Sequence, residues 1–174
     1  KVVISAGHLI RRKGIIDFLN LASAMPETLF IWFGGGNCWA VPQDIRKVIQ
    51  KKPDNVVFAV YVNPQELKEA YCGADAFAFF SYEETEGIVV LEALSCEVPV
   101  VVRDIPVYEG WLQDGIHVYK ASGTCDFGRK LEKIFSGSCA EMTGAGRRLA
   151  EERGIYHTGM RLNEIYQTEK LGDV

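Results

Sequence analysis

The chain has 174 residues, which is the size of a single domain, and its hydrophobic content of 48% excludes an intrinsically disordered polymer. The net charge of −4 gives no overall positive field, so a nucleic acid is not an expected partner. The five cysteines are scattered and never stand in a Cys-x-x-Cys spacing, which argues against a disulfide framework or a zinc knuckle and favours a reducing, cytoplasmic location.

Short apolar runs alternate with helical patterns along the chain. The runs predict strands at Val2–Ala6, Leu29–Gly34, Val56–Val60, Ala76–Phe80 and Val98–Val102. Helices are expected at Gly14–Met25, at Pro42–Lys51, after the capping residue Asn63, at Ile88–Ser95, at Asp126–Phe135, and from Ser138 to Lys170 with a break at Gly154. This alternation is typical of an α/β fold with a Rossmann-like, doubly wound parallel sheet. We expect residues 1–174 to form one domain, and because the chain begins inside its first strand, we expect a domain excised from a longer enzyme.

Glycine-rich or polar segments follow four of the predicted strands. Ligands of such sheets bind at the carboxyl ends of the strands, so we expect a cleft bordered by Gly7–Lys13, Gly34–Gly36, Tyr61–Asn63 and Ser81–Gly87. Gly34–Gly36 lacks the Gly-x-Gly-x-x-Gly spacing and follows the second strand, which favours a loop lining the cleft over a dinucleotide fingerprint.

The segment from Ser81 to Leu94 places two carboxylates eight residues apart, Glu84 and Glu92, on either side of Gly87. Gly87 falls at a turn from a strand into a helix, where a glycine lets a ligand approach the backbone. The amides of residues 88–90 would start the helix unpaired, with the positive end of its dipole behind them, which suits a diphosphate. Carboxylates suit the hydroxyls of a ribose or a hexose, and each such charge-assisted hydrogen bond contributes roughly 1.5–3 kcal/mol. The pattern predicts a nucleotide-sugar site.

This segment resembles the Glu-x7-Glu signature of retaining glycosyltransferases of the glycosyltransferase B (GT-B) fold. Two further matches stand in the same order along the chain as in that family. They are Gly7-His8-Leu9-Ile10-Arg11-Arg12-Lys13-Gly14, and Pro99-Val100-Val101-Val102 followed by Asp104-Ile105-Pro106-Val107-Tyr108-Glu109. The resemblance covers roughly residues 1–135 and implies that the chain is the C-terminal, donor-binding half of a GT-B fold.

The resemblance also implies the roles of individual residues. Lys13 and a second cation would bind the diphosphate and Glu84 the transferred sugar, which makes Lys13 and Glu84 the catalytic pair. The implied nucleotide-binding residues are Gly7, His8, Arg12, Tyr61, Val62, Gly87, Ile88, Val89 and Glu92, with Glu92 on the ribose and the residues at 61 and 62 on the base. No metal or other cofactor is expected, because cations and the helix dipole would replace a metal at the diphosphate.

Two positions depart from the family pattern. His8 stands where the family usually has arginine, so Arg11 or Arg12 could supply the second cation, and His8 could be a structural histidine or a donor contact. Glu86 stands where phenylalanine is common. Tyr61 and Val62 have core packing as an equal alternative to base binding.

Three segments resemble those of bacterial glycolipid synthases that glycosylate diacylglycerol or its monoglycosyl form. They are residues 83–94 around the two glutamates, Ile31-Trp32-Phe33-Gly34, and Val102-Arg103-Asp104-Ile105-Pro106-Val107-Tyr108. The implied reaction is transfer of a hexose from UDP-glucose or UDP-galactose with retention, with the acceptor held mainly by an N-terminal domain of the same enzyme. A membrane lipid as acceptor would bring a cytoplasmic enzyme to the inner face of the plasma membrane. The alternatives are the donor half of a GT-B nucleotide-sugar epimerase or hydrolase, and a non-catalytic nucleotide-binding module.

Overall fold

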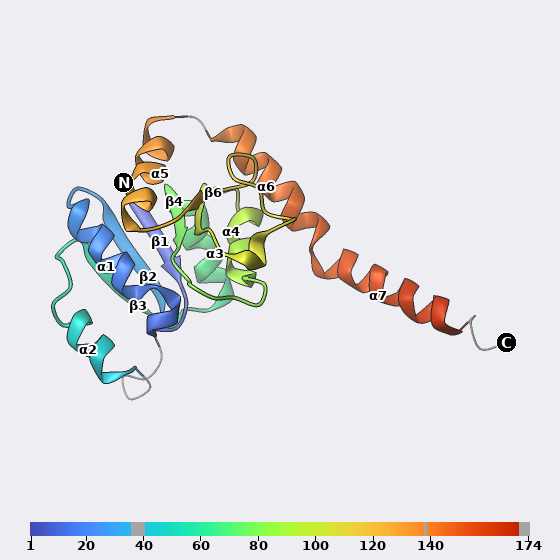
Figure 1. The fold of residues 1–174 in the computed structure, drawn as a ribbon, viewed down its shortest axis with the longest axis horizontal. Coiled ribbons are helices and arrows are strands. Elements are labelled where there is room, and N and C mark those ends of the chain that lie inside the picture. The colour runs from blue at the N-terminus through green and yellow to red at the C-terminus, as the bar shows by residue number, and fades with distance from the viewer. Residues whose placement is uncertain (36–40, 138, 171–174) are drawn as a thin grey trace.

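The computed structural model describes residues 1–35, 41–137 and 139–170, so Gly36 and Ser138 of the sequence predictions lie outside the described residues. Its centre is a six-stranded parallel sheet in the order β3-β2-β1-β4-β5-β6 (Figure 1). The strands are β1 (Val2–Ala6), β2 (Leu29–Gly35), β3 (Val56–Val60), β4 (Ala76–Phe79), β5 (Val100–Arg103) and β6 (Tyr119–Ala121). This order, with its reversal between β1 and β4, confirms the doubly wound α/β prediction.

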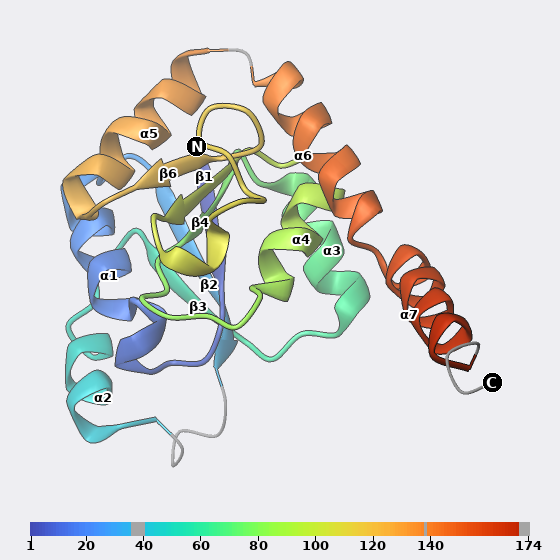
Figure 2. The ribbon, with the colours of Figure 1, turned by 45° about the vertical axis from the view of Figure 1, so that its right-hand side comes forward.

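Helices cover both faces of the sheet (Figure 2). One face carries α1 (Ile15–Ala24), α2 (Gln43–Ile49) and α5 (Thr124–Ser136), and the other carries α3 (Pro64–Gly73), α4 (Ile88–Ser95) and α6 (Ala140–Glu152). Alternate residues of β1 serve the two cores, since Val3 packs with the first set of helices and Ile4 with the second. The strands are therefore buried on both sides, which explains their continuous apolar runs.

The predicted elements are present with shifts of one or two residues at most of their ends. Asn63 caps the helix that follows it, as predicted, and forms a capping box: the Asn63 side chain accepts from the Glu66 amide at 2.9 Å, and the Glu66 carboxylate accepts from the Asn63 amide at 2.9 Å. The predicted break at Gly154 separates α6 from α7 (Ile155–Lys170). The sixth strand, β6, was not predicted, because three residues including a lysine give no periodic signal.

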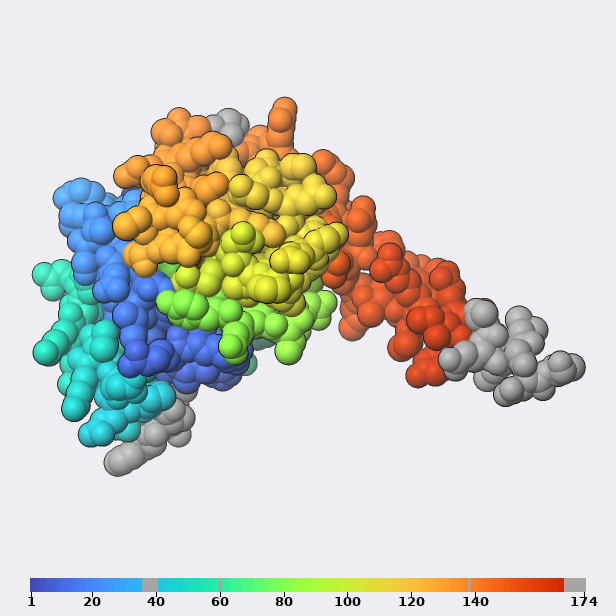
Figure 3. Space-filling model, in the orientation of Figure 1, coloured from blue at the N-terminus to red at the C-terminus, as the bar shows by residue number. Residues whose placement is uncertain are grey.

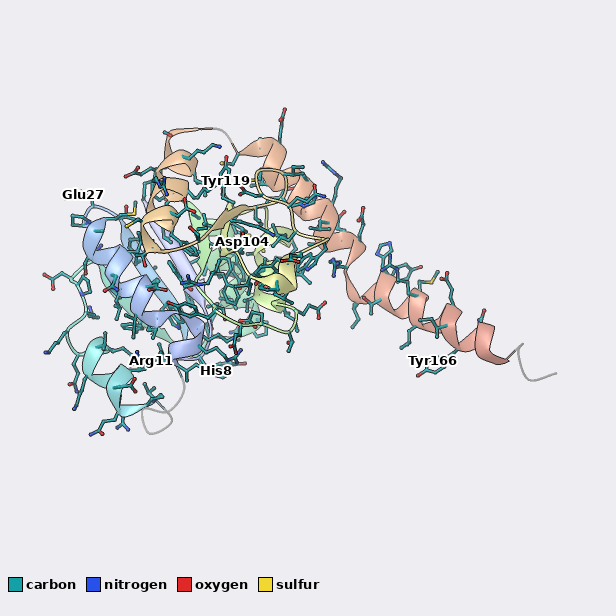
Figure 4. All side chains as sticks on the ribbon, in the orientation of Figure 1. His8, Arg11, Glu27, Asp104, Tyr119 and Tyr166 are labelled. Carbon is teal, nitrogen blue, oxygen red and sulfur yellow. The ribbon has the colours of Figure 1, made fainter. Side chains whose placement is uncertain are left out.

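The last helix, α7, extends away from the body of the domain as an arm (Figures 1 and 3). Its Tyr166 points into solvent (Figure 4) and is 60% exposed. Within the described part of the chain, no helix combines the length and the apolar character that crossing a membrane requires.

Candidate functional site

The carboxyl ends of the central strands border a cavity of about 660 Å³. Its walls come from the loops after β1, β3 and β4, from the ends of β2 and β4, and from the start of α4. The lining residues are Ala6, Gly7, His8, Lys13, Gly34, Gly35, Tyr61, Phe79, Glu84, Thr85, Glu86, Gly87, Ile88 and Val89. The cleft expected from the sequence is therefore present at the expected edge of the sheet.

Lys13 and Glu84 meet at this cavity as an ion pair between Nζ and Oε1. Their side chains are only 14% and 9% exposed, so the pair is largely shielded from solvent. Two residues 71 positions apart in the sequence thus meet. Sequence analysis assigned both to one donor molecule but did not predict a direct contact between them.

The local backbone explains how the two side chains come together. Lys13 ends a short 3₁₀ helix, η1 (Arg11–Lys13), and Gly14 follows in the left-handed region with φ 77°. A Cβ on Gly14 would lie 2.3 Å from the Phe80 carbonyl oxygen, so only glycine lets η1 pack directly on the end of β4. The Tyr82 amide then donates to the Arg12 carbonyl at 2.9 Å, which joins the turn before Lys13 to the loop before Glu84.

Gly87 is the N-cap of α4 and has φ 83°, as the predicted strand-to-helix turn requires. The Val90 amide donates to the Gly87 carbonyl at 2.8 Å, which corrects the expectation that it points out of the helix unpaired. In the described part of the chain the amides of Ile88 and Val89 have no acceptor, and both residues line the cavity. Two amides and the helix dipole are thus available to an anion.

A second cavity of about 810 Å³ lies between α3 and α4 and shares Tyr61 and Val89 with the first. Val62 and Glu92 line it, as does Tyr71 of α3. The Tyr71 hydroxyl donates to Glu92 Oε2 at 3.3 Å, and burial together with the Glu92 charge raises the pKa of Tyr71. Tyr71 therefore stays protonated and orients the carboxylate.

Tyr61 is 78% exposed, which excludes the core-packing alternative for this residue, whereas Val62 is partly buried. The aromatic ring lies where the two cavities meet. It is available for stacking on a planar ligand, as base binding would require.

The basic residues at η1 do not all face the cavity. Arg12 donates from Nη1 to the Glu83 carbonyl at 2.8 Å, and Arg11 pairs with Asp44 at 2.7 Å; both line a separate cavity on the outer side. His8 is exposed and does line the site, at the edge of the domain where Figure 4 labels it. Arg12 as a diphosphate ligand stays a prediction that this geometry does not favour.

Sequence reasoning missed a cluster beside the Glu84 loop, in which Arg103 and Asp17 are mostly buried and Tyr82 is about half exposed. Arg103 at the end of β5 donates from Nε to the Phe80 carbonyl at 3.0 Å and forms an ion pair with Asp17. Its guanidinium lies 3.9 Å from the centroid of the Tyr82 ring, and the Tyr82 hydroxyl donates to Asp17 at 2.6 Å. The cluster fixes the start of the loop to β5 and α1. An arginine ending an otherwise apolar strand was the available signal.

The described residues contain no group of three or more His, Cys, Asp or Glu side chains able to hold a metal ion. Metal-independent binding remains a prediction for experiment.

The family described as "Glycosyl transferases group 1" matches residues 1–148. Among curated proteins, the chain is 45% identical over 167 residues to a "Processive diacylglycerol alpha-glucosyltransferase" of Acholeplasma laidlawii, covering 96% of this chain and 50% of the relative. It is 37% identical over 111 residues to an "Alpha-galactosylglucosyldiacylglycerol synthase" of Streptococcus pneumoniae, covering 62% of this chain and 30% of the relative. The chain thus spans about half the length of these relatives, or less.

Solved structures support the fold. Anabaena Alr3699/HepE in complex with UDP and glucose aligns with a TM-score of 0.85 at 17% identity, over 96% of this chain and 48% of that one. Sucrose-phosphate synthase from Thermosynechococcus elongatus aligns with a TM-score of 0.86 at 17% identity, over 99% of this chain and 46% of that one. The domain has the architecture of one half of each.

Proposed function

The chain belongs to the glycosyl transferases group 1 family, and from this premise we propose that it is the donor-binding half of a retaining hexosyltransferase. Its substrate would be a nucleotide diphosphate sugar, with UDP-glucose and UDP-galactose as the leading candidates. The acceptor and any group that acts on it would come mainly from a second, N-terminal domain, so the isolated chain would bind the donor without transferring the sugar.

The observation that carries this proposal is that two cavities sharing Tyr61 and Val89 offer groups suited to different parts of one ligand. The first holds a lysine and two free helix amides, which suit a diphosphate, and the second holds the Glu92 carboxylate, which suits ribose hydroxyls. Tyr61 lies where they meet. An elongated ligand with a diphosphate between a sugar and a nucleoside fits this spatial order of groups across the two cavities.

The proposed chemistry is stabilisation of the leaving group. As the glycosidic bond breaks, negative charge grows on the diphosphate, and Lys13 with the amides of Ile88 and Val89 would stabilise that charge. The backbone that carries these groups is fixed by the packing of Gly14 and by the start of α4. Once donor binding has moved Lys13 from Glu84 to the diphosphate, little further reorganisation would accompany charge development.

Glu84 would hold the transferred sugar through its hydroxyls. Its side chain is largely buried beside Lys13. A carboxylate that can accept hydrogen bonds from a sugar and an ammonium group that can donate to a phosphate thus lie next to each other in one cavity. Once the diphosphate attracts Lys13, the Glu84 carboxylate would be free to accept hydrogen bonds from the hexose.

We extend the proposal to a glycolipid product on the strength of the relatives. The A. laidlawii and S. pneumoniae proteins carry names of enzymes that act on diacylglycerol lipids. A diacylglycerol-type acceptor for the enzyme that contains this chain would place it at a membrane surface, by contacts outside the donor site.

Calorimetry with the full-length protein tests donor binding. UDP, UDP-glucose, UDP-galactose and GDP are titrated with EDTA present and again with magnesium. We expect the UDP ligands to bind in EDTA with affinity that magnesium does not change. Absence of binding to millimolar nucleotide in EDTA, with recovery in magnesium, would contradict the metal-free site. Absence of binding under both conditions would contradict the donor assignment.

A further inference from the structure

Tyr108 carries a buried hydroxyl that takes no part in the proposed binding of the donor or stabilisation of the leaving group. The residue ends the 3₁₀ helix η3 (Pro106–Tyr108) after β5 and is 0% exposed. Its ring packs edge-on against Trp111, with centroids 5.7 Å apart. Among the described residues, its hydroxyl has no hydrogen-bond partner. Such groups are rare in folded proteins, because an unmade hydrogen bond of a buried polar group lowers stability.

The hydroxyl lies directly beneath the turn that carries Glu84 into α4. It would be 2.8 Å from a Cβ placed on Gly87, so it touches the backbone at the N-cap of that helix. Burial and then the negative charge of Glu84 raise the pKa of Tyr108. Like an ordinary tyrosine, Tyr108 keeps its proton at neutral pH, and Glu84 is the carboxylate whose charge contributes to the higher pKa.

Donor binding would deprive the Glu84 carboxylate of its ion pair with Lys13. In the free protein the carboxylate is paired with Lys13, and both side chains are mostly buried. If Lys13 turns to the diphosphate, Glu84 loses its cation inside a shielded site, where an uncompensated carboxylate is unfavourable. A nearby hydroxyl donor without an acceptor would compensate part of that loss.

The segment between Glu84 and Gly87 is able to adjust. Thr85 and Glu86 are exposed, and no hydrogen bond within the described residues ties them to the body of the domain. The firm attachments lie on either side, at the Arg12 contact with Glu83 and at the start of α4. Segments with few hydrogen bonds and few buried contacts rearrange at low free-energy cost.

We propose that Tyr108 is a positioning residue whose hydroxyl donates to Glu84 when the donor sugar is bound. In the free protein Lys13 forms an ion pair with Glu84, and the Tyr108 hydroxyl makes no hydrogen bond among the described residues. In the donor complex Lys13 pairs with the diphosphate instead, and the Tyr108 hydroxyl donates to Glu84 and orients it toward the hexose. This inference rests on the proposed function, because it assigns Lys13 and Glu84 to the donor.

The test compares Tyr108→Phe with the parental full-length protein. Tyr119→Phe on β6, away from both cavities, is the matched control. Thermal melting without ligand reports whether the hydroxyl is bonded in the free state. Calorimetry gives the Kd for UDP and for whichever of UDP-glucose and UDP-galactose the parental protein binds more tightly.

We expect Tyr108→Phe to melt at the parental temperature or above it, and to bind UDP within about twofold of the parental Kd. Its Kd for the UDP-hexose should rise about tenfold, equivalent to about 1.4 kcal/mol. Added to Glu84→Ala, the same substitution should not change the UDP-hexose Kd of that single variant, because the carboxylate that accepts the Tyr108 hydrogen bond is absent. Tyr119→Phe should bind both ligands as the parent does.

Three results would overturn the inference. A clear fall in melting temperature would mean that the hydroxyl is already bonded in the free protein. An unchanged UDP-hexose Kd in Tyr108→Phe, with normal binding by the parent, would defeat this inference alone. Failure of the parent to bind UDP or either UDP-hexose would defeat the proposed function and this inference with it.

Discussion

Replacing Gly87 with alanine tests the geometry at the start of α4. Gly87 has φ 83°, and a Cβ there would lie 2.8 Å from the Tyr108 hydroxyl and 3.4 Å from the ring carbon Cε1. Tyr108 is fully buried against Trp111, so the ring cannot swing into solvent to relieve the overlap. The substitution therefore combines backbone strain with a steric conflict.

The two contributions can be estimated separately. A non-glycine residue in the left-handed region costs about 1–2 kcal/mol. Forcing extra volume into a packed interior costs about 1–3 kcal/mol. Gly87→Ala should thus lower the free energy of unfolding by about 2–5 kcal/mol, and the displaced turn should also weaken UDP binding, since it presents the Ile88 and Val89 amides.

Gly110 provides a matched control. It has φ 77°, close to that of Gly87, but a Cβ there would meet nothing within 4 Å. Gly110→Ala should cost only the backbone contribution of about 1–2 kcal/mol and leave UDP affinity unchanged. Urea denaturation gives the free energies and calorimetry the affinities. If Gly87→Ala costs no more than Gly110→Ala and binds UDP normally, the close packing of Tyr108 under the turn is wrong.

Four further substitutions test individual roles in the full-length protein. Glu92→Gln removes the charge that we propose binds the ribose, and should weaken UDP binding about tenfold, or about 1.4 kcal/mol; an unchanged Kd by calorimetry would mean that Glu92 is an ordinary surface carboxylate. Lys13→Ala should lower kcat on the order of a hundredfold or more, as loss of one strong oxyanion-type contact does, while Glu84→Ala should damage transfer and spare UDP affinity. Parental transfer rates in Lys13→Ala, or loss of UDP in Glu84→Ala as severe as in Glu92→Gln, would refute these assignments. Arg103→Met leaves the mostly buried Asp17 unpaired and should lower the free energy of unfolding by about 3–5 kcal/mol; a loss below about 1 kcal/mol in urea denaturation would mean that the cluster does not hold the loop.

The sheet and the helix start at Gly87 were predictable because they depend on local patterns. Continuous apolar strands announce a sheet buried on both faces, and the glycine between the two glutamates marks a turn that other residues enter only with strain. The resemblance to the glycosyltransferase family then assigned Lys13 and Glu84 to one site, where the structure joins them as an ion pair.

Side-chain direction was not predictable in the same way. Arg12 immediately precedes Lys13, yet it turns to the Glu83 carbonyl on the outer side, because successive residues of a tight helical turn point in different directions. Tyr108 was quoted only as part of a matching segment. Its burial under Gly87 depends on contact between elements about twenty residues apart, which periodicity does not encode.

The central claim is that the diphosphate of a nucleotide sugar sits between Lys13 and the start of α4. A crystal structure of the full-length protein with UDP tests it most directly. We predict diphosphate oxygens within hydrogen-bonding distance of the Ile88 and Val89 amides and of Lys13 Nζ, with the Lys13 pairing to Glu84 broken. A diphosphate bound elsewhere, or one that leaves Lys13 paired with Glu84, would contradict the account.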